Sequence, residues 1–384
     1  MVMSLTKEKI YRAAILTIPG IGSQRLRQLI ALYGSAENAW KTQQFTDSPE
    51  RFSWFQKFKH ARQKIDLEKV ESLLVKENIS MVILGEENYP CLLAECLGAP
   101  PLLFYKGVLT SGQKGLAVVG SRRATAYGRA AAAYFAKELV KHNYIVVSGL
   151  ARGIDSSAHQ GALDGNGVTW AFLAGGLDSI YPKENSNLAR RIMEKGALIS
   201  EYPPGIPAEP GHFPARNRLI SGSSMGVLVV EAAEKSGSLI TVDYALEQGR
   251  EVYAVPGPIF SEQSKGTHNL IKIGAKLVAG IEDILCELPP GYRTDFCKQQ
   301  NDHLQTERRQ SLSENALNEE ASYTKDEIWQ EILECLSDVP LHIDRLTAIC
   351  KISAQDIALG LLELQLAGKV IQLPGQNYVL QRKV

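Results

Sequence analysis

The sequence lacks an excess of charge of either sign: 42 lysines and arginines stand against 42 aspartates and glutamates, and the formal net charge is zero. A chain without a basic bias is not drawn to nucleic acid as a whole, so any site for a polyanion must be a local patch. No apolar run reaches membrane-spanning length, and residues 1–9 lack the apolar core of a signal peptide. We therefore expect a cytoplasmic protein that does not associate with membranes.

Cysteine is also scarce, with 6 in 384 residues, and no two have the CxxC spacing typical of zinc and redox sites. This spacing argues against a disulfide framework and against a metal site, so we expect reduced cysteines that pack among apolar side chains. The composition is otherwise that of a globular protein, with 45% hydrophobic residues. The length allows two or three domains.

Short apolar runs, each continuous rather than alternating, indicate buried parallel strands. They lie at residues 116–119, 144–147, 168–173, 227–230 and 252–255. Helical patterns lie between them, so we predict an open parallel α/β sheet covered on both faces. Right-handed crossovers bring all the strand carboxyl ends to one edge, where such sheets bind ligands. The turns expected to converge there are 120–123, 148–153, 175–176, 201–205 and 235–238.

The segment 211–218 carries the most chemistry in this region. Pro214 fits the first turn of a helix, and Arg216 lies three residues from Phe213 and hence on the same face. An aromatic ring beside guanidinium groups suits contact with a stacked base and its phosphates. On composition alone, Phe213 could equally be a core residue.

Several helix starts are candidate anion sites, because free backbone amides point out of the first turn of a helix. They follow the turns at 120–123 and 236–238. The first of these turns lacks the three-glycine spacing of a dinucleotide site, so we expect no nucleotide cofactor. A third candidate is the Gly-x-Gly turn at residues 20–22, which is typical of a helix-hairpin-helix that meets a phosphate. A plain tight turn between two helices is an equal alternative.

Asp155 and His159 are four residues apart and could pair on one helix face, as a general base with its orienting carboxylate would. No nucleophile motif accompanies them. We favour the simpler interpretation, in which Asp155 caps a helix and His159 lies on its polar face. We therefore predict no catalytic residues.

The pattern along the chain predicts four parts: a helical domain at 1–80, the sheet domain at 81–288, a flexible linker at 289–325 and a third domain at 326–384. Strands at 81–84 and 102–105 should extend the sheet or cap its edge. The last part shows three short helices and a β-hairpin, typical of a winged helix. Its third helix, 354–366, has no lysine or arginine, which favours partner docking or regulation over reading a DNA groove.

Taken together, these motifs resemble the DprA (Smf) family, the DNA-processing proteins of bacterial natural transformation. The matching pieces are VGSR at 119–122, SGLARGID at 148–155, GLD at 176–178, YP at 181–182, SEYP at 200–203, FPARNR at 213–218, EA at 231–232, SGS at 236–238 and EQGR at 247–250. The resemblance is dense over residues 80–285 and looser over the flanking domains.

The resemblance implies an extended Rossmann-like sheet with an N-terminal helix-hairpin-helix (SAM-like) domain and a C-terminal winged-helix domain. It implies a homodimer that binds and protects incoming single-stranded DNA, displaces single-strand-binding protein and loads the RecA recombinase. By motif position Arg122 would contact phosphates, while Phe213 would stack on bases beside further phosphate contacts from Arg216 and Arg218. The full predicted site is Gly120, Ser121, Arg122, Arg152, Phe213, Arg216, Asn217, Arg218, Ser236, Gly237 and Ser238, to which the loop position adds Lys235. Neither a metal nor a cofactor is expected.

Two other functions compete. A nucleotide phosphoribohydrolase of the lysine-decarboxylase-like group would hold a nucleotide phosphate with Arg122, Glu231 and the turn at 236–238, but its Pro-Gly-Gly-x-Gly-Thr turn is missing. A transcription factor would act through the winged helix, and the uncharged third helix argues against it.

Overall fold

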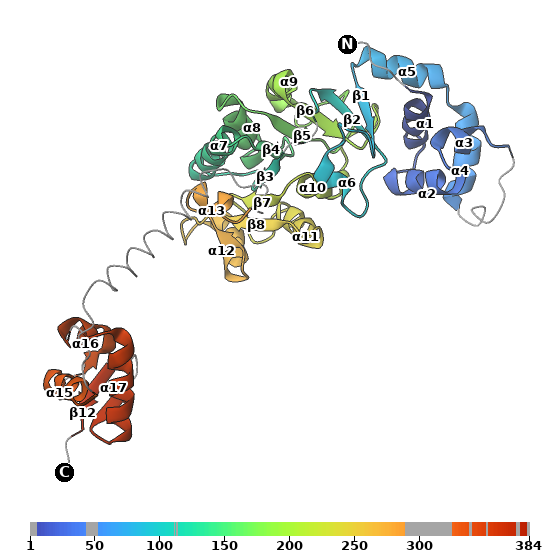
Figure 1. Cartoon of the computed structure of the whole chain (residues 1–384). Helices are drawn as coiled ribbons and strands as arrows, with labels where there is room; N and C mark the ends of the chain where they lie inside the picture. Colours follow the sequence, from blue (N-terminus) through green and yellow to red (C-terminus); the bar gives the residue numbers. More distant parts are fainter. Residues whose placement is uncertain are drawn as a thin grey trace. The chain divides into compact units, whose positions relative to one another are not determined.

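The structure is a computed structural model that describes residues 6–43, 53–110, 112, 114–288, 325–337, 340–350, 352–373 and 377–381. The chain divides into two compact units, residues 1–300 and 301–384 (Figure 1). The predicted linker, 289–325, lies outside the described residues except for Lys325, where α15 begins.

The first unit begins with amphipathic helices, as the sequence predicts. They are α1 (Lys7–Leu16), α2 (Ser23–Tyr33), α3 (Ala36–Lys41), α4 (Ser53–Ala61) and α5 (Leu67–Lys76), with the 3-10 turn η2 (Arg62–Lys64). Ser35 and Asp66 start α3 and α5 by accepting backbone amides with their side chains. Leu26 and Phe55 belong to one buried cluster with Leu198 of the sheet. The helices and the sheet therefore share a core.

Nine described strands form one sheet. They are β1 (Ser80–Ile83), β2 (Leu102–Gly107), β3 (Gly115–Val119), β4 (Ile145–Ser148), β5 (Thr169–Phe172), β6 (Ala197–Ser200), β7 (Gly226–Val229), β8 (Glu251–Ala254) and β9 (Lys276–Leu277). Their order is β1-β2-β6-β5-β4-β3-β7-β8-β9, with parallel pairing from β6 to β9 and antiparallel pairing of β1 and β2.

The five strands predicted from apolar runs are present as β3, β4, β5, β7 and β8, and the α/β fold class is confirmed. The strands predicted at 81–84 and 102–105 extend the sheet as β1 and β2. The sequence analysis missed β6 and β9. β9 has only two residues, too few for an apolar run. β6 has four residues, as many as the predicted strands β4, β5, β7 and β8, so its length does not explain why it was missed.

Helices cover both faces of this sheet (Figure 1). In chain order they are α6 (Cys91–Ala94), α7 (Ala126–Lys141), α8 (Ile154–Asp164), α9 (Ser186–Lys195), α10 (His212–Gly222), α11 (Leu239–Glu247), α12 (Lys265–Lys272) and α13 (Glu282–Leu285), with the 3-10 turns η3 (Lys183–Asn185) and η4 (Glu262–Ser264). Leu116 and Val118 of β3 pack with α7, α8 and α13. Ala117 and Val119 belong to the opposite core, with α10, α11 and α12.

The strand order fixes where a ligand site can form. From β3 the chain adds β4, β5 and β6 in one direction, then returns to place β7 on the other side of β3. The connections that leave β3 and β7 therefore diverge, and a crevice opens between them at the strand carboxyl ends.

The second unit is a winged helix, as predicted. It consists of α15 (Lys325–Cys335), β10 (Leu341–His342), α16 (Ile343–Cys350), α17 (Ala354–Leu366), β11 (Val370–Leu373) and β12 (Asn377–Leu380). The strands pair in the order β10-β12-β11, and the helices bury Ile332, Leu346 and Leu361 in one core. None of the described helices in either unit combines the length and apolar character that crossing a bilayer requires.

Candidate nucleic-acid interface

A cavity of about 680 Å³ lies between the carboxyl ends of β3 and β7, where the crevice is expected. We call it the switch-point cavity. The turns after β3, β4 and β7 line it, together with the start of α10. The predicted site residues that it contains are Gly120, Ser121, Arg122, Phe213, Arg216, Asn217, Ser236, Gly237 and Ser238. The close approach of two turns needs Gly153, since a Cβ there would lie 2.3 Å from the Ser121 carbonyl oxygen.

The rim of the cavity is a stack of side chains from three elements. The guanidinium carbon of Arg122 lies 4.7 Å from the centre of the Phe213 ring, a cation–π contact. The Tyr181 ring meets Phe213 edge-on, with centres 5.7 Å apart, and is 55% exposed. Arg122 and Arg123 are exposed, and neither forms an ion pair with a described residue. The rim therefore offers cations and rings to a ligand.

Arg216 forms the floor of the cavity rather than its rim. The side chain is 3% exposed, and its Nη1 donates to the carbonyl oxygens of Gly149 and Phe172. Burial lowers the pKa of Arg216 to about 10, so the group stays charged at neutral pH. Internal partners take Nη1 and Nε of Arg216, so a direct phosphate contact would have to come from Nη2, and the contact expected for Arg216 stays a prediction. Its charge still acts on the cavity.

Buried polar groups beneath the turn after β4 hold that turn in place. Asp155 accepts the amides of Gly149 and Ala151 with Oδ2, at 3.2 and 3.4 Å. It is not the N-cap of α8, since Gly153 takes that position. Burial raises the pKa of the Asp155 carboxyl, and the charge of Arg216 opposes this rise.

His159 does not pair with Asp155. Its Nε2 accepts the Leu150 amide at 3.3 Å, and its Nδ1 lies 2.7 Å from Thr169 Oγ1, whose own proton goes to the Val146 carbonyl. His159 Nδ1–H is therefore the donor in this contact. Burial lowers the pKa of His159 to about 3. A neutral, fully bonded imidazole supports the structural interpretation over the general base.

The start of α7 is not an open anion site, contrary to the prediction from the turn at 120–123. Glu231, which is 2% exposed, accepts the Thr125 amide with Oε2 at 2.9 Å and the Thr125 hydroxyl with Oε1 at 2.5 Å. An internal carboxylate thus occupies this helix start. The same contacts remove Glu231 from the role that the phosphoribohydrolase alternative gives it.

The turn before α11 is tied to α10 through Asn217. Its Nδ2 donates to the Gly237 carbonyl at 3.4 Å, and its Oδ1 accepts from Arg216 Nε at 3.2 Å. Within the turn, the hydroxyls of Ser236 and Ser238 lie 2.8 Å apart. One amide side chain therefore links the cationic floor to the serine turn.

The predicted convergence of five turns holds for three of them. The Gly176 amide donates to Ile206, so residues 203–208 cover the end of β5. Glu201, after β6, faces a separate cavity of about 880 Å³ that also contacts the α1–α2 loop. Arg218 lies there as well, with Nη2 2.5 Å from Glu201 Oε2 and Nη1 3.0 Å from the Gly98 oxygen. The reason is the length of the segment between β6 and α10, which folds back over this part of the edge.

Two further predicted residues lie outside the switch-point cavity. Arg152 forms an exposed ion pair with Glu184, with Nε 2.6 Å from Oε1. Lys235 is exposed and is not among the residues that line the cavity. Tyr181 and Arg123 line it although neither was among the predicted site residues, and Arg123 was placed there only as part of the turn at 120–123. The signal for Tyr181 was present in the Tyr-Pro pair at 181–182, which served only as a matching motif of the family resemblance.

The Gly-x-Gly turn before α2 behaves as a plain turn. Ser23 Oγ, at the start of α2, donates to Glu201 at 2.9 Å, so a carboxylate already faces this helix start. The guanidinium groups of Arg25 and Arg27 donate to the carbonyls of Gly20 and Ala99. These contacts favour the packing turn over a phosphate site.

Two family models match the sequence. The model described as DNA recombination-mediator protein A matches residues 80–289, and the model described as DprA winged helix domain matches residues 318–376. The chain is 34% identical over 397 residues to Protein Smf of Synechocystis sp., which covers 97% of this chain and 98% of that protein.

Solved structures are similar as well. DprA from Streptococcus pneumoniae has a TM-score of 0.62 and 36% identity, covering 75% of this chain and 99% of that one. DprA from Helicobacter pylori, whose structure describes a single-stranded DNA binding mode of that protein, has a TM-score of 0.48 and 30% identity, covering 54% and 93%.

Proposed function

This chain belongs to the DprA (Smf) family of DNA recombination-mediator proteins, and we propose that it binds single-stranded DNA in the switch-point cavity. The observation that carries the proposal is the stack of Arg122 on Phe213 above the buried charge of Arg216. It combines a cation and a ring at the one edge of the sheet where a ligand crevice is open.

The rim supplies the two interactions that sequence-independent binding of a single strand requires. Arg122 and Arg123 attract phosphates, while Tyr181 and the Phe213–Arg122 stack offer flat surfaces to bases. Each stacked base contributes about 1–3 kcal/mol in such sites. Because the chain has no net charge, this local cluster must provide the electrostatic attraction.

The remaining predicted residues take secondary places in the proposal. The DNA strand would run along the cavity wall, in contact with the backbone of Gly120 and Ser121 and with the turn at Ser236–Ser238. Lys235 would meet a phosphate where the strand leaves the cavity. Arg152 and Arg218 are weaker candidates, because Glu184 and Glu201 already neutralise them.

A binding titration tests this function. Fluorescence anisotropy with a labelled oligothymidine strand should show binding that weakens with salt, and the matched duplex should bind less tightly. Preference for the duplex would overturn the proposal and favour a role of the winged helix. Release of free base from nucleoside monophosphates would instead identify an enzyme.

We further infer, from the family, a non-catalytic cytoplasmic homodimer that protects incoming DNA and passes it to the RecA recombinase while displacing single-strand-binding protein. The β9 edge of the sheet supports self-association, since Ile273 and Leu277 are 77% and 43% exposed there. Recombinase ATPase activity on strands coated with single-strand-binding protein should rise when this chain is added. If the ATPase activity does not rise, the loading role is contradicted. The proposed binding of single-stranded DNA is then tested only by the titration above.

A further inference from the structure

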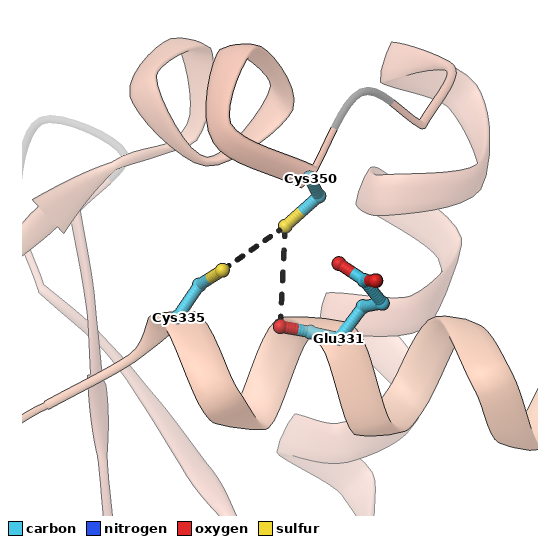
Figure 2. A group of neighbouring side chains, drawn as sticks. All are labelled: Glu331, Cys335 and Cys350. Carbon is cyan, nitrogen blue, oxygen red and sulfur yellow. Dashed lines mark hydrogen bonds between the residues drawn. The ribbon is translucent and has the colours of Figure 1, made fainter.

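Two cysteines that are distant in sequence meet in the winged helix. Cys335 is the last residue of α15 and Cys350 is the last residue of α16. Their sulfur atoms lie 3.5 Å apart, and Cys350 Sγ lies 4.0 Å from the backbone oxygen of Glu331 (Figure 2). Cys350 is 6% exposed and Cys335 is half-buried.

A carboxylate completes the group. Glu331 and Cys335 are four residues apart on α15, so both side chains project from the same side of that helix toward Cys350 (Figure 2). The two sulfurs and a carboxylate oxygen of Glu331 all lie within 4.8 Å of one another. Across the described residues, this is the one group of three such ligands that is so close.

We propose that Glu331, Cys335 and Cys350 form a zinc site. A tetrahedral Zn²⁺ ion with sulfur ligands at about 2.3 Å holds two sulfurs about 3.8 Å apart. The observed 3.5 Å separation is close to that value. A disulfide, in contrast, needs the sulfurs about 2.05 Å apart and therefore a much larger approach.

The ligand chemistry selects the same class of ion. Thiolates favour soft or borderline ions such as Zn²⁺ over Mg²⁺ and Ca²⁺, and a carboxylate is a common additional ligand of zinc. Because Glu331 is exposed, a water molecule has access to the fourth position. On binding, each thiol releases its proton to solvent and the sulfur becomes a thiolate ligand.

The site would join the ends of two helices in a small domain. The α15 and α16 helices already share a core through Ile332 and Leu346, and a bound ion would fix their C-terminal ends as well. The sequence analysis expected no metal because it looked for CxxC spacing. Here the ligands come from two helices, and only the fold brings them together.

The test uses the full chain, reduced and stripped of metal. Titration with Co²⁺ should give one equivalent of bound ion, with the thiolate-to-cobalt charge-transfer band and the visible bands of a tetrahedral site, and Zn²⁺ should displace it. Cys335→Ser and Cys350→Ala should lose the charge-transfer band. Glu331→Gln should keep the band with weaker binding. Cys91→Ser, which removes an exposed cysteine of the first unit, is the matched control and should bind as the parent does.

Several outcomes would overturn the proposal. The first is a reduced parent chain without the band, and the second is a Cys335→Ser variant that binds Co²⁺ as tightly as the parent. A third outcome is an unreduced chain that is lighter than the reduced chain by two hydrogens, combined with no metal binding after reduction. This result would identify a simple disulfide between the two cysteines. Far-ultraviolet circular dichroism of each variant separates loss of the ligand from loss of the fold.

Discussion

The Arg122 guanidinium lies over the face of Phe213, with its carbon 4.7 Å from the ring centre, although one residue follows β3 and the other begins α10. The contact orients a cation that has no carboxylate partner among the described residues. It also covers one face of the ring. A base would therefore stack on the guanidinium plane or on Tyr181 rather than directly on that face.

Removing the exposed cation should change the salt dependence of binding. Arg122→Ala should lower the affinity for oligothymidine and flatten the plot of log affinity against log salt by about 0.7, the value for one lost phosphate contact with a single strand. Arg190→Ala, on the exposed face of α9, is the matched control and should leave both quantities unchanged. Equal slopes for the parent and Arg122→Ala would remove Arg122 from the interface.

Removing the rings should weaken binding without altering the charge. Tyr181→Ala should lower affinity by about five- to 150-fold, which corresponds to the loss of about 1–3 kcal/mol of stacking, with an unchanged salt slope. Tyr181→Phe should restore most of it. Phe213→Ala should have a similar effect, with a small change of slope because it also frees Arg122. Binding of Tyr181→Ala at parent strength would exclude Tyr181 as a stacking platform.

Arg216 should matter for stability before it matters for binding. Arg216→Met leaves the carbonyls of Gly149 and Phe172 without this donor and removes the cation near Asp155, so we expect a loss of about 3–5 kcal/mol in the free energy of unfolding. Urea denaturation measures it, with Arg190→Met as the control. A loss below about 1 kcal/mol would show that the buried guanidinium is dispensable.

His159 should make the first unit less stable in acid. Its pKa is about 3 in the folded chain and about 6.5 when unfolded, so between these values only the unfolded chain binds the proton. The contribution of the neutral ring is complete above pH 6.5 and falls by about 1.4 kcal/mol for each pH unit below it. The raised pKa of Asp155 acts in the opposite sense.

Comparison with His159→Gln isolates this contribution, because Asp155 titrates in both proteins. From pH 7.5 to pH 5, the parent should lose about 2 kcal/mol more than the variant in the free energy of unfolding. The measurement is chemical denaturation at both pH values. Parallel losses would mean that His159 is protonated in the folded chain.

The arrangement of the sheet could be predicted because continuous apolar runs, glycine turns and intervening helical patterns are local properties. From the order of strands it followed that the turns after β3, β4 and β7 share an edge. The positions of individual side chains could not be predicted in this way. Whether Arg216 or Arg122 reaches solvent depends on which carbonyls lie beside it, and Phe172 and Gly149 are far away in the sequence.

Sequence spacing alone also could not show that Arg216 and Arg218 reach different cavities. Arg218 and Arg216 are two residues apart on α10 and therefore point to different sides of the helix, one toward Glu201 and one toward Gly149. A motif that lists both arginines together cannot show this. The proximity of Cys335 and Cys350 could not be predicted for a related reason. Spacing rules such as CxxC apply to cysteines that are close in sequence, and these two come from different helices.

The neighbouring positions of β3 and β7 have a consequence for folding. Ala117 pairs with Val227, so the cavity forms only after a long stretch of chain has been ordered between them. A nascent chain that ends after β6 would contain Arg122 but neither Phe213 nor the serine turn. Binding of single-stranded DNA should therefore return late in refolding, after most of the helical structure. The delay between the two signals would measure how long β3 and β7 take to pair.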